Sequence, residues 1–297
     1  MTNPAQTSVN IRGAMIMAAS MLAFVLNDGL MKLLFTDISI YQAVFLRGVM
    51  TVPIIGLIAV YRKQLFVRVS GHDWKIISIR VAGEVGATVL FLTALANMPL
   101  ANVTAILQAL PLAVTMAAAL FLGEPVGWRR WTAILVGFCG VMVIVRPGLE
   151  GFSIYSLYAL AAVACVTLRD VATRKLSPAA PSLLVAMMTA IGITILGFVM
   201  LPTIEWVPAS QTQWFILAGA AAAIVGGYLF SIMAMRAGDI SFIAPFRYTA
   251  MVWAILMGVL VFGDWPDMTT LIGTGIVVAT GMYSFHRENL RTRAATA

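Results

Sequence analysis

Charged residues are scarce in this 297-residue sequence. Only 10% are Asp, Glu, Lys or Arg, whereas soluble domains carry about 25%, and mean hydropathy is +0.95. This excludes an ordinary soluble domain. Since a bilayer is crossed by about 20 apolar residues whose amides must be bonded internally, we predict an all-α integral membrane protein. Its ten expected spans are residues 11–35, 39–60, 74–97, 100–122, 129–145, 153–172, 181–201, 213–235, 241–262 and 268–285.

Cysteine and histidine are rare as well, with two of each. Cys139 and Cys165 fall inside expected spans, where they are interpreted as small packing residues. His72 and His286 lie at helix ends, so we expect no metal site. The sequence has no GxxxxGK[ST] phosphate loop and no HExxH pair, and no Ser, His and acid share one membrane depth. We therefore expect neither an enzyme nor a bound cofactor.

The excess of basic over acidic residues, net +7, indicates topology rather than nucleic-acid binding. Basic residues gather in alternate loops, which places both termini in the cytoplasm by the positive-inside rule. No soluble output domain fits in the tails, so a sensor is disfavoured. The basic residues in question are Arg62, Lys63, Arg68, Lys75, Arg129, Arg130, Arg174, Lys175, Arg236, Arg287, Arg291 and Arg293.

A weak internal repeat divides the chain into residues 1–148 and 149–297. Gly123-Glu124 ends the fourth expected span and Gly263-Asp264 ends the ninth, an offset of 140 positions. Each half would hold five spans, and because five is odd the second half must enter the membrane from the opposite side. Inverted repeats of this kind are typical of secondary transporters.

Several stretches in both halves match a known module. They are residues 94–101, 110–112, 121–125, 137–140 and 146–148, Arg47, and residues 245–248 and 262–266. They resemble the EamA module of the drug/metabolite transporter (DMT) superfamily and, within it, the YddG type of bacterial amino-acid exporter. The resemblance implies two inverted five-helix repeats around a cavity lined by spans 1, 3, 4, 6, 8 and 9. It also implies export of a small-molecule substrate across the bacterial inner membrane without ATP.

Two charges lie deep in the first two spans. Asp28 and Arg47 are both about 12 Å from the outer end, and we expect them to pair, with Lys32 able to share the interaction. Inserting a charge at the bilayer centre costs about 2.5–3.5 kcal/mol, so we expect these two residues to have a structural or functional role. They either hold the two helices together or contact the substrate. Asp28 or Glu84 could also carry a coupling proton, although nearby arginines favour a facilitator.

A second group of charges lies at the cytoplasmic side. Arg80 and Glu84 are four residues apart on one helix and can pair. Arg169 and Asp170 close the sixth span, and Arg247 lies one to two turns into the ninth. We predict that Arg80, Glu84, Asp170 and Arg247 form an inner gate. The alternative is a solvated vestibule without a switching role.

Polar residues in the middle of the cavity helices are the candidate substrate ligands. Gln108 and Tyr248 occupy equivalent positions of the repeat and are the preferred pair. A mostly apolar pocket with scattered hydrogen-bonding groups suits a zwitterion with an apolar side chain, or a flat organic cation. Amino-acid export is therefore the leading function, and multidrug or organic-cation efflux, possibly proton-coupled, is the alternative. The full set is Gln108, Tyr248, Asn102, Thr88, Tyr228 and Trp253.

Two prolines inside spans predict hinges. Pro111 cannot donate to the carbonyl of Leu107, and Pro245 cannot donate to that of Ser241, so each helix should bend there. Small residues four apart, Ala133–Gly137 and Gly275–Ala279, allow close helix packing. We expect each pair to tie its hairpin to its own bundle, and both a monomer and a homodimer stay open.

Overall fold

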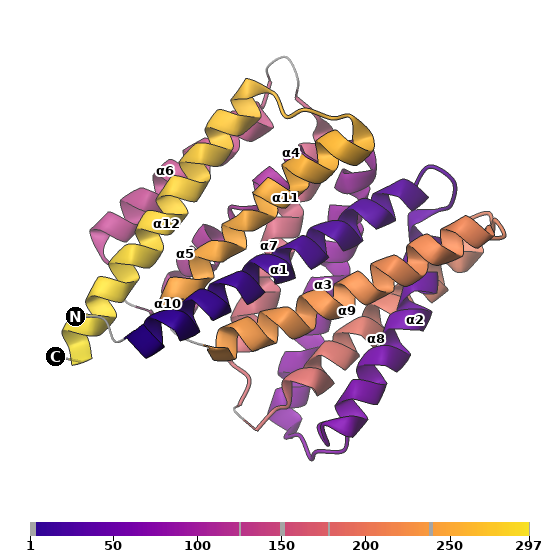
Figure 1. Ribbon diagram of the computed structural model, residues 1–297, viewed down its shortest axis with the longest axis horizontal. Coiled ribbons are helices and arrows are strands. Elements are labelled where there is room, and N and C mark those ends of the chain that lie inside the picture. The colour runs from indigo at the N-terminus through magenta and orange to yellow at the C-terminus, as the bar shows by residue number, and fades with distance from the viewer. Residues whose placement is uncertain (1–3, 125, 149–151, 178, 238–239, 297) are drawn as a thin grey trace. The chain divides into compact units, whose positions relative to one another are not determined.

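The computed structural model describes residues 4–124, 126–148, 152–177, 179–237 and 240–296 (Figure 1). Within these residues all regular structure is helical, which confirms the predicted class. The elements are α1 (Pro4–Leu34), α2 (Ile40–Tyr61), α3 (Gly71–Asn97), α4 (Leu100–Leu107), α5 (Leu110–Leu122), α6 (Trp128–Val145), α7 (Ile154–Arg174), α8 (Ser182–Met200), η1 (Leu201–Thr203), α9 (Gln211–Ala237), α10 (Ile240–Ile243), η2 (Ala244–Tyr248), α11 (Thr249–Met257), η3 (Gly258–Phe262) and α12 (Met268–Thr296).

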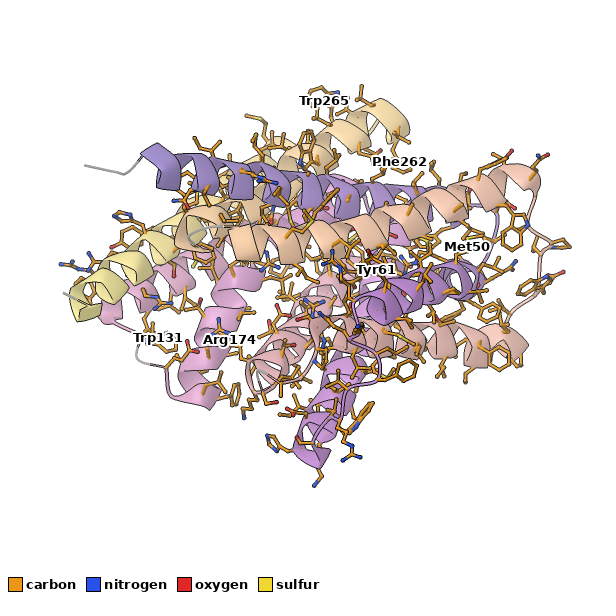
Figure 2. All side chains as sticks on the ribbon, turned by 60° about the horizontal axis from the view of Figure 1, so that its bottom comes forward. Met50, Tyr61, Trp131, Arg174, Phe262 and Trp265 are labelled. Atoms are coloured by element: carbon orange, nitrogen blue, oxygen red, sulfur yellow. The ribbon has the colours of Figure 1, made fainter. Side chains whose placement is uncertain are left out.

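Ten helical segments among the described residues are long and apolar enough to cross a membrane, and they match the ten predicted spans. Large apolar side chains on them face outward, for example Leu57 at 72% and Leu260 at 80% exposure, as lipid contact requires. Tyr61 and Trp265 are exposed at span ends, where aromatic residues anchor at membrane interfaces (Figure 2). Three of these spans, the fourth, the seventh and the ninth, are built from more than one helical element, and in the seventh the second element is only the terminal 3₁₀ turn η1.

The chain forms two compact units, and each draws helices from both sequence halves. Unit 1 comprises Met1–Leu26, Met98–Leu160 and Gly226–Ala297, and unit 2 comprises Asn27–Asn97 and Ala161–Val225. The compact units therefore cut across the predicted repeats instead of coinciding with them.

In unit 1, α6 and α12 lie side by side along their length (Figure 1). A Cβ atom added at Gly273 would lie 2.7 Å from the carbonyl oxygen of Gly140, so this crossing requires glycine. Spans 5 and 10 pack on each other, and Gly137 faces both Leu112 of span 4 in its own half and Thr280 of span 10, so the predicted packing within its own half is only part of its role. Gly275 has open space beside it and takes no part in the crossing.

In unit 2, α2 and α8 form the corresponding close pair (Figure 1). A Cβ at Gly197 would lie 2.7 Å from the backbone nitrogen of Phe45, and one at Gly48 would lie 2.9 Å from the Cβ of Thr194. Small residues thus let two backbones approach closely on both helices, as is common between helices in membranes.

Candidate functional site

The fourth span is broken in its middle. Helix α4 ends at Leu107, α5 begins at Leu110, and Pro111 is in the first turn of α5. Pro111 has no N–H for the carbonyl of Leu107, and the backbone resumes α-helical bonding when Ala113 donates to Ala109 at 2.9 Å. The interruption predicted at Pro111 is therefore present.

The ninth span is broken in a related way. A single turn, α10, is followed by the 3₁₀ segment η2, which holds Pro245 in its first turn and ends at Tyr248. Regular α-helix begins only at Thr249. Runs of 3₁₀ helix in the middle of a longer helix often mark functional hinges, and the hinge at Pro245 stays a prediction.

The two breaks meet within unit 1. The Nε2 of Gln108 donates a hydrogen bond of 3.3 Å to the backbone carbonyl of Tyr248, and both residues are buried. The repeat-equivalent residues chosen from the sequence are thus direct neighbours. The Oδ1 of Asn102 on α4 is also buried and has no hydrogen-bond partner among the described residues.

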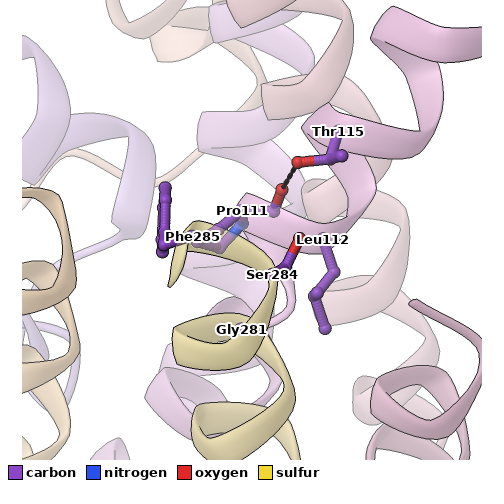
Figure 3. Close-up of a pocket in the computed structure, with 6 residues that line it drawn as sticks. All are labelled: Pro111, Leu112, Thr115, Gly281, Ser284 and Phe285. Carbon is purple, nitrogen blue, oxygen red and sulfur yellow. Dashed lines mark hydrogen bonds between the residues drawn. The ribbon is translucent and has the colours of Figure 1, made fainter. Parts of the chain in front are cut away.

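The side chain of Tyr248 reaches α12. The nearest atoms to a Cβ added at Gly281 belong to the Tyr248 ring and hydroxyl. Beside this contact, residues of α5 and α12 line a shallow crevice (Figure 3). In it, the Oγ1 of Thr115 donates to the carbonyl of Pro111 at 2.8 Å. The lining residues are Pro111, Leu112, Thr115, Gly281, Ser284 and Phe285.

Two other predicted ligands of unit 1 make contacts with α1. The Nε1 of Trp253 donates to the carbonyl of Ala18 at 3.1 Å, and Trp253 packs against a buried apolar cluster that includes Met17 and Met21 of α1. Because the indole has only this one donor, Trp253 can offer a substrate its ring face but no further hydrogen bond. Tyr228 packs edge-on against Phe24 with ring centres 5.4 Å apart.

In unit 2, Asn27 bridges the two deep charges. The Nη1 of Arg47 donates to the Oδ1 of Asn27 at 2.8 Å, and the Nδ2 of Asn27 donates to Asp28 at 2.9 Å. The direct Asp28–Arg47 ion pair stays a prediction, and the sequence did not predict that the Asn27 amide would contact both residues. Lys32 donates to the carbonyl of Leu95 at 2.8 Å, which ties α1 to the end of α3.

The charges of unit 2 that were predicted to form a gate link α3 to α7. Glu84 pairs with Arg169 at 2.7 Å, and Arg169 also bonds Asp170 at 2.8 Å. Arg80 donates to the Oγ1 of Thr173 at 2.6 Å. The contacts described here run between helices, and the predicted Arg80–Glu84 pair along α3 stays a prediction.

Arg169 is the member of this cluster that sequence reasoning left out of the gate. The signal that could have pointed to Arg169 was Gly83. A Cβ at Gly83 would lie 3.1 Å from the carbonyl oxygen of Cys165, so α3 and α7 approach closely there.

Two other predicted residues lie outside this cluster. Thr88 is half-buried, one turn beyond Glu84 on α3. Arg247 lies exposed on η2 in unit 1, so its role in a gate stays a prediction.

Comparison with known proteins identifies the chain at the level of family. Residues 11–146 and 153–283 each match the EamA-like transporter family. The chain is similar to a riboflavin transporter of Vibrio cholerae, with 29% identity over 80% of this chain and 81% of the relative. It is also similar to an S-adenosylmethionine uptake transporter of Rickettsia conorii, with 25% identity over 64% of each chain.

A further relative matches almost end to end. The pseudopaline exporter CntI of Pseudomonas aeruginosa is 25% identical over 90% of this chain and 93% of the relative. The family match covers both halves of the sequence, and the matched residues contain all ten membrane-spanning segments in whole or in large part. The chain therefore belongs to the EamA-like transporter family of the DMT superfamily and is a multi-pass membrane transporter, not an enzyme.

Proposed function

We propose that this chain is a secondary transporter that exports amino acids, or larger amphipathic metabolites carrying an amino-acid group, by alternating access and without ATP. The observation that carries the proposal is the paired interruption of spans 4 and 9, where Gln108 bonds the backbone of Tyr248. Transporters commonly build substrate sites from discontinuous helices at equivalent positions of two inverted repeats.

The chemistry of the groups at these breaks favours a zwitterionic or neutral polar substrate. The amide of Gln108, the hydroxyl of Tyr248 and the amide oxygen of Asn102 are uncharged donors and acceptors held in apolar surroundings. Phosphate groups would instead favour convergent arginines. Among the compounds in the relatives' names, S-adenosylmethionine carries an α-amino-acid group on a large amphipathic body. We assign substrate contacts to Gln108, Tyr248, Asn102, Thr88, Tyr228 and Trp253.

We assign the cytoplasmic gate to the link between α3 and α7. Glu84 and Arg169 have side chains only 11% and 19% exposed, so their pair is far less screened than a surface pair. The gathering of basic residues in alternate loops supports cytoplasmic termini in a bacterial inner membrane, by the positive-inside rule, and this orientation would put the link at the cytoplasmic end. We assign a structural role to Asp28, Asn27 and Arg47. Each hydrogen bond described for them is made to another member of this group of three.

Organic-cation efflux, coupled to protons, is the second candidate. The observation that favours it is Asp28, a carboxylate within the first span. The hydrogen bond described for Asp28 comes from the neutral amide of Asn27, and a neutral donor does not cancel the charge of the carboxylate. A carboxylate in that place can bind either a cation or a proton, which is the basis of an exchange of the two.

Uptake into proteoliposomes tests the proposal. Labelled tryptophan, phenylalanine, threonine and methionine are offered with and without a pH gradient, and Gln108→Leu is compared with Asn97→Leu, an exposed position near the end of α3. We expect uptake without a gradient, competition by unlabelled amino acids, and loss of uptake in Gln108→Leu alone. If none of the four amino acids is taken up, either with or without the pH gradient, amino-acid transport is contradicted. Uptake of labelled tetraphenylphosphonium driven by the gradient would then support the second candidate.

A further inference from the structure

The Tyr248 hydroxyl occupies a notch in α12 that exists because residue 281 has no side chain. A Cβ added at Gly281 would overlap the hydroxyl oxygen and lie 2.6 Å from Cζ and 3.2 Å from Cε2 of the same ring. All three nearest neighbours thus belong to Tyr248, so the space at Gly281 serves that one side chain.

The hydroxyl in this notch is an unmet hydrogen-bonding group. Tyr248 is only 6% exposed, and its oxygen has no hydrogen-bond partner among the described residues. A buried hydroxyl without a partner is unfavourable relative to one that is bonded. The notch therefore accommodates the Tyr248 side chain sterically but gives its hydroxyl no hydrogen bond. A second side-chain position in which the hydroxyl is hydrogen-bonded would compete with the position in the notch.

The segment that carries Tyr248 can supply such a second position. The five residues of η2 are coiled as 3₁₀ helix, which turns about 120° per residue compared with about 100° in α-helix. Recoiling all five would rotate Tyr248 by about 100° relative to Ile243 and shorten the segment by about 2.5 Å. Pro245 favours the 3₁₀ form, because its ring would clash with the carbonyl of Ser241 in an α-helix.

We propose that Gly281 is a positioning residue for transport, because it holds the Tyr248 hydroxyl in a resting notch from which recoiling of η2 releases it to bond the substrate. The inference rests on the proposed role of Tyr248 in binding substrate. The acceptor on the substrate is a carboxylate or carbonyl oxygen, since Tyr248 contributes an O–H donor.

A double-mutant cycle tests this inference. Gly281→Ala blocks the notch and favours the released position, so substrate binds more tightly and leaves more slowly. We expect the half-saturating concentration and the maximal exchange rate both to fall about threefold to tenfold, the range of one hydrogen bond. A merely structural defect would lower the maximal rate and leave the half-saturating concentration unchanged. In a Tyr248→Ala background, Gly281→Ala should have no further effect.

Gly275→Ala is the matched control, because it adds the same methyl to the same helix with nothing within 4 Å. Unchanged exchange kinetics in Gly281→Ala, or equal effects with and without Tyr248, would overturn the inference. If wild-type protein exchanges none of the amino acids, the proposed function fails and the same cycle is read from melting temperatures in detergent. Gly281→Ala should then lower the melting temperature only where Tyr248 is present, and an equal loss in both backgrounds would overturn it.

Discussion

Replacing Glu84 by glutamine tests the link between α3 and α7. The glutamine keeps the size and an acceptor oxygen for Arg169 but removes the charge. Separating a fully buried ion pair costs about 3–5 kcal/mol, and an exposed one about 0–1 kcal/mol. The Glu84–Arg169 pair lies between these limits with side chains 11% and 19% exposed, and Arg169 retains Asp170 at 2.8 Å. We therefore expect a shift of about 1–2 kcal/mol toward separated helices, which is about 5- to 30-fold in the equilibrium.

The chain contains its own reporter for this separation. Cys165 lies one turn before Arg169 on α7, and its sulfur would be 3.3 Å from a Cβ at Gly86 of α3. In a Cys139→Ala background, a membrane-impermeant maleimide should label Cys165 about 5- to 30-fold faster from the cytoplasmic side in Glu84→Gln.

The control is Asp37→Asn, which removes a charge from an exposed position between α1 and α2 of the same unit. It should leave the labelling rate unchanged. An unchanged rate in Glu84→Gln as well would refute the gate, and the charges would then be a solvated vestibule. Faster labelling in both variants would instead show a general loosening of unit 2.

Two further predictions concern unit 1. Gly273→Ala places a methyl 2.7 Å from the carbonyl oxygen of Gly140, so we expect the free energy of unfolding to fall by about 1–3 kcal/mol. The melting temperature should then be lower than in Gly275→Ala, and equal melting temperatures would contradict the packing argument. Outside the spans, partial burial raises the pKa of Asp267, but hydrogen bonds at the start of α12 and from Arg146 outweigh it and hold that pKa below 3.8. The stabilisation is therefore present above about pH 4 and lost as pH falls through the lowered pKa. The carboxylate is 48% exposed, so the contribution is below about 1 kcal/mol, and Asp267→Asn should flatten the melting temperature between pH 5 and 3.

Local chemistry determined most of the fold. Apolar runs of bilayer length placed all ten spans, because a backbone in lipid has few ways to bond itself. Pro111 and Pro245 identified the two interruptions, since a missing N–H acts on the helix that contains it. The repeat offset paired Gln108 with Tyr248, which are in direct contact.

Tertiary structure alone decided the neighbours. The partner of Glu84 is Arg169 on another helix, Asn27 stands between Asp28 and Arg47, and Gly281 receives the ring of Tyr248. Hydropathy and spacing describe where one helix begins, ends and bends, but they do not state which face of which other helix lies against it. That choice depends on side-chain shape and hydrogen bonding summed over helices far apart in the chain, and it becomes visible only when the helices are packed.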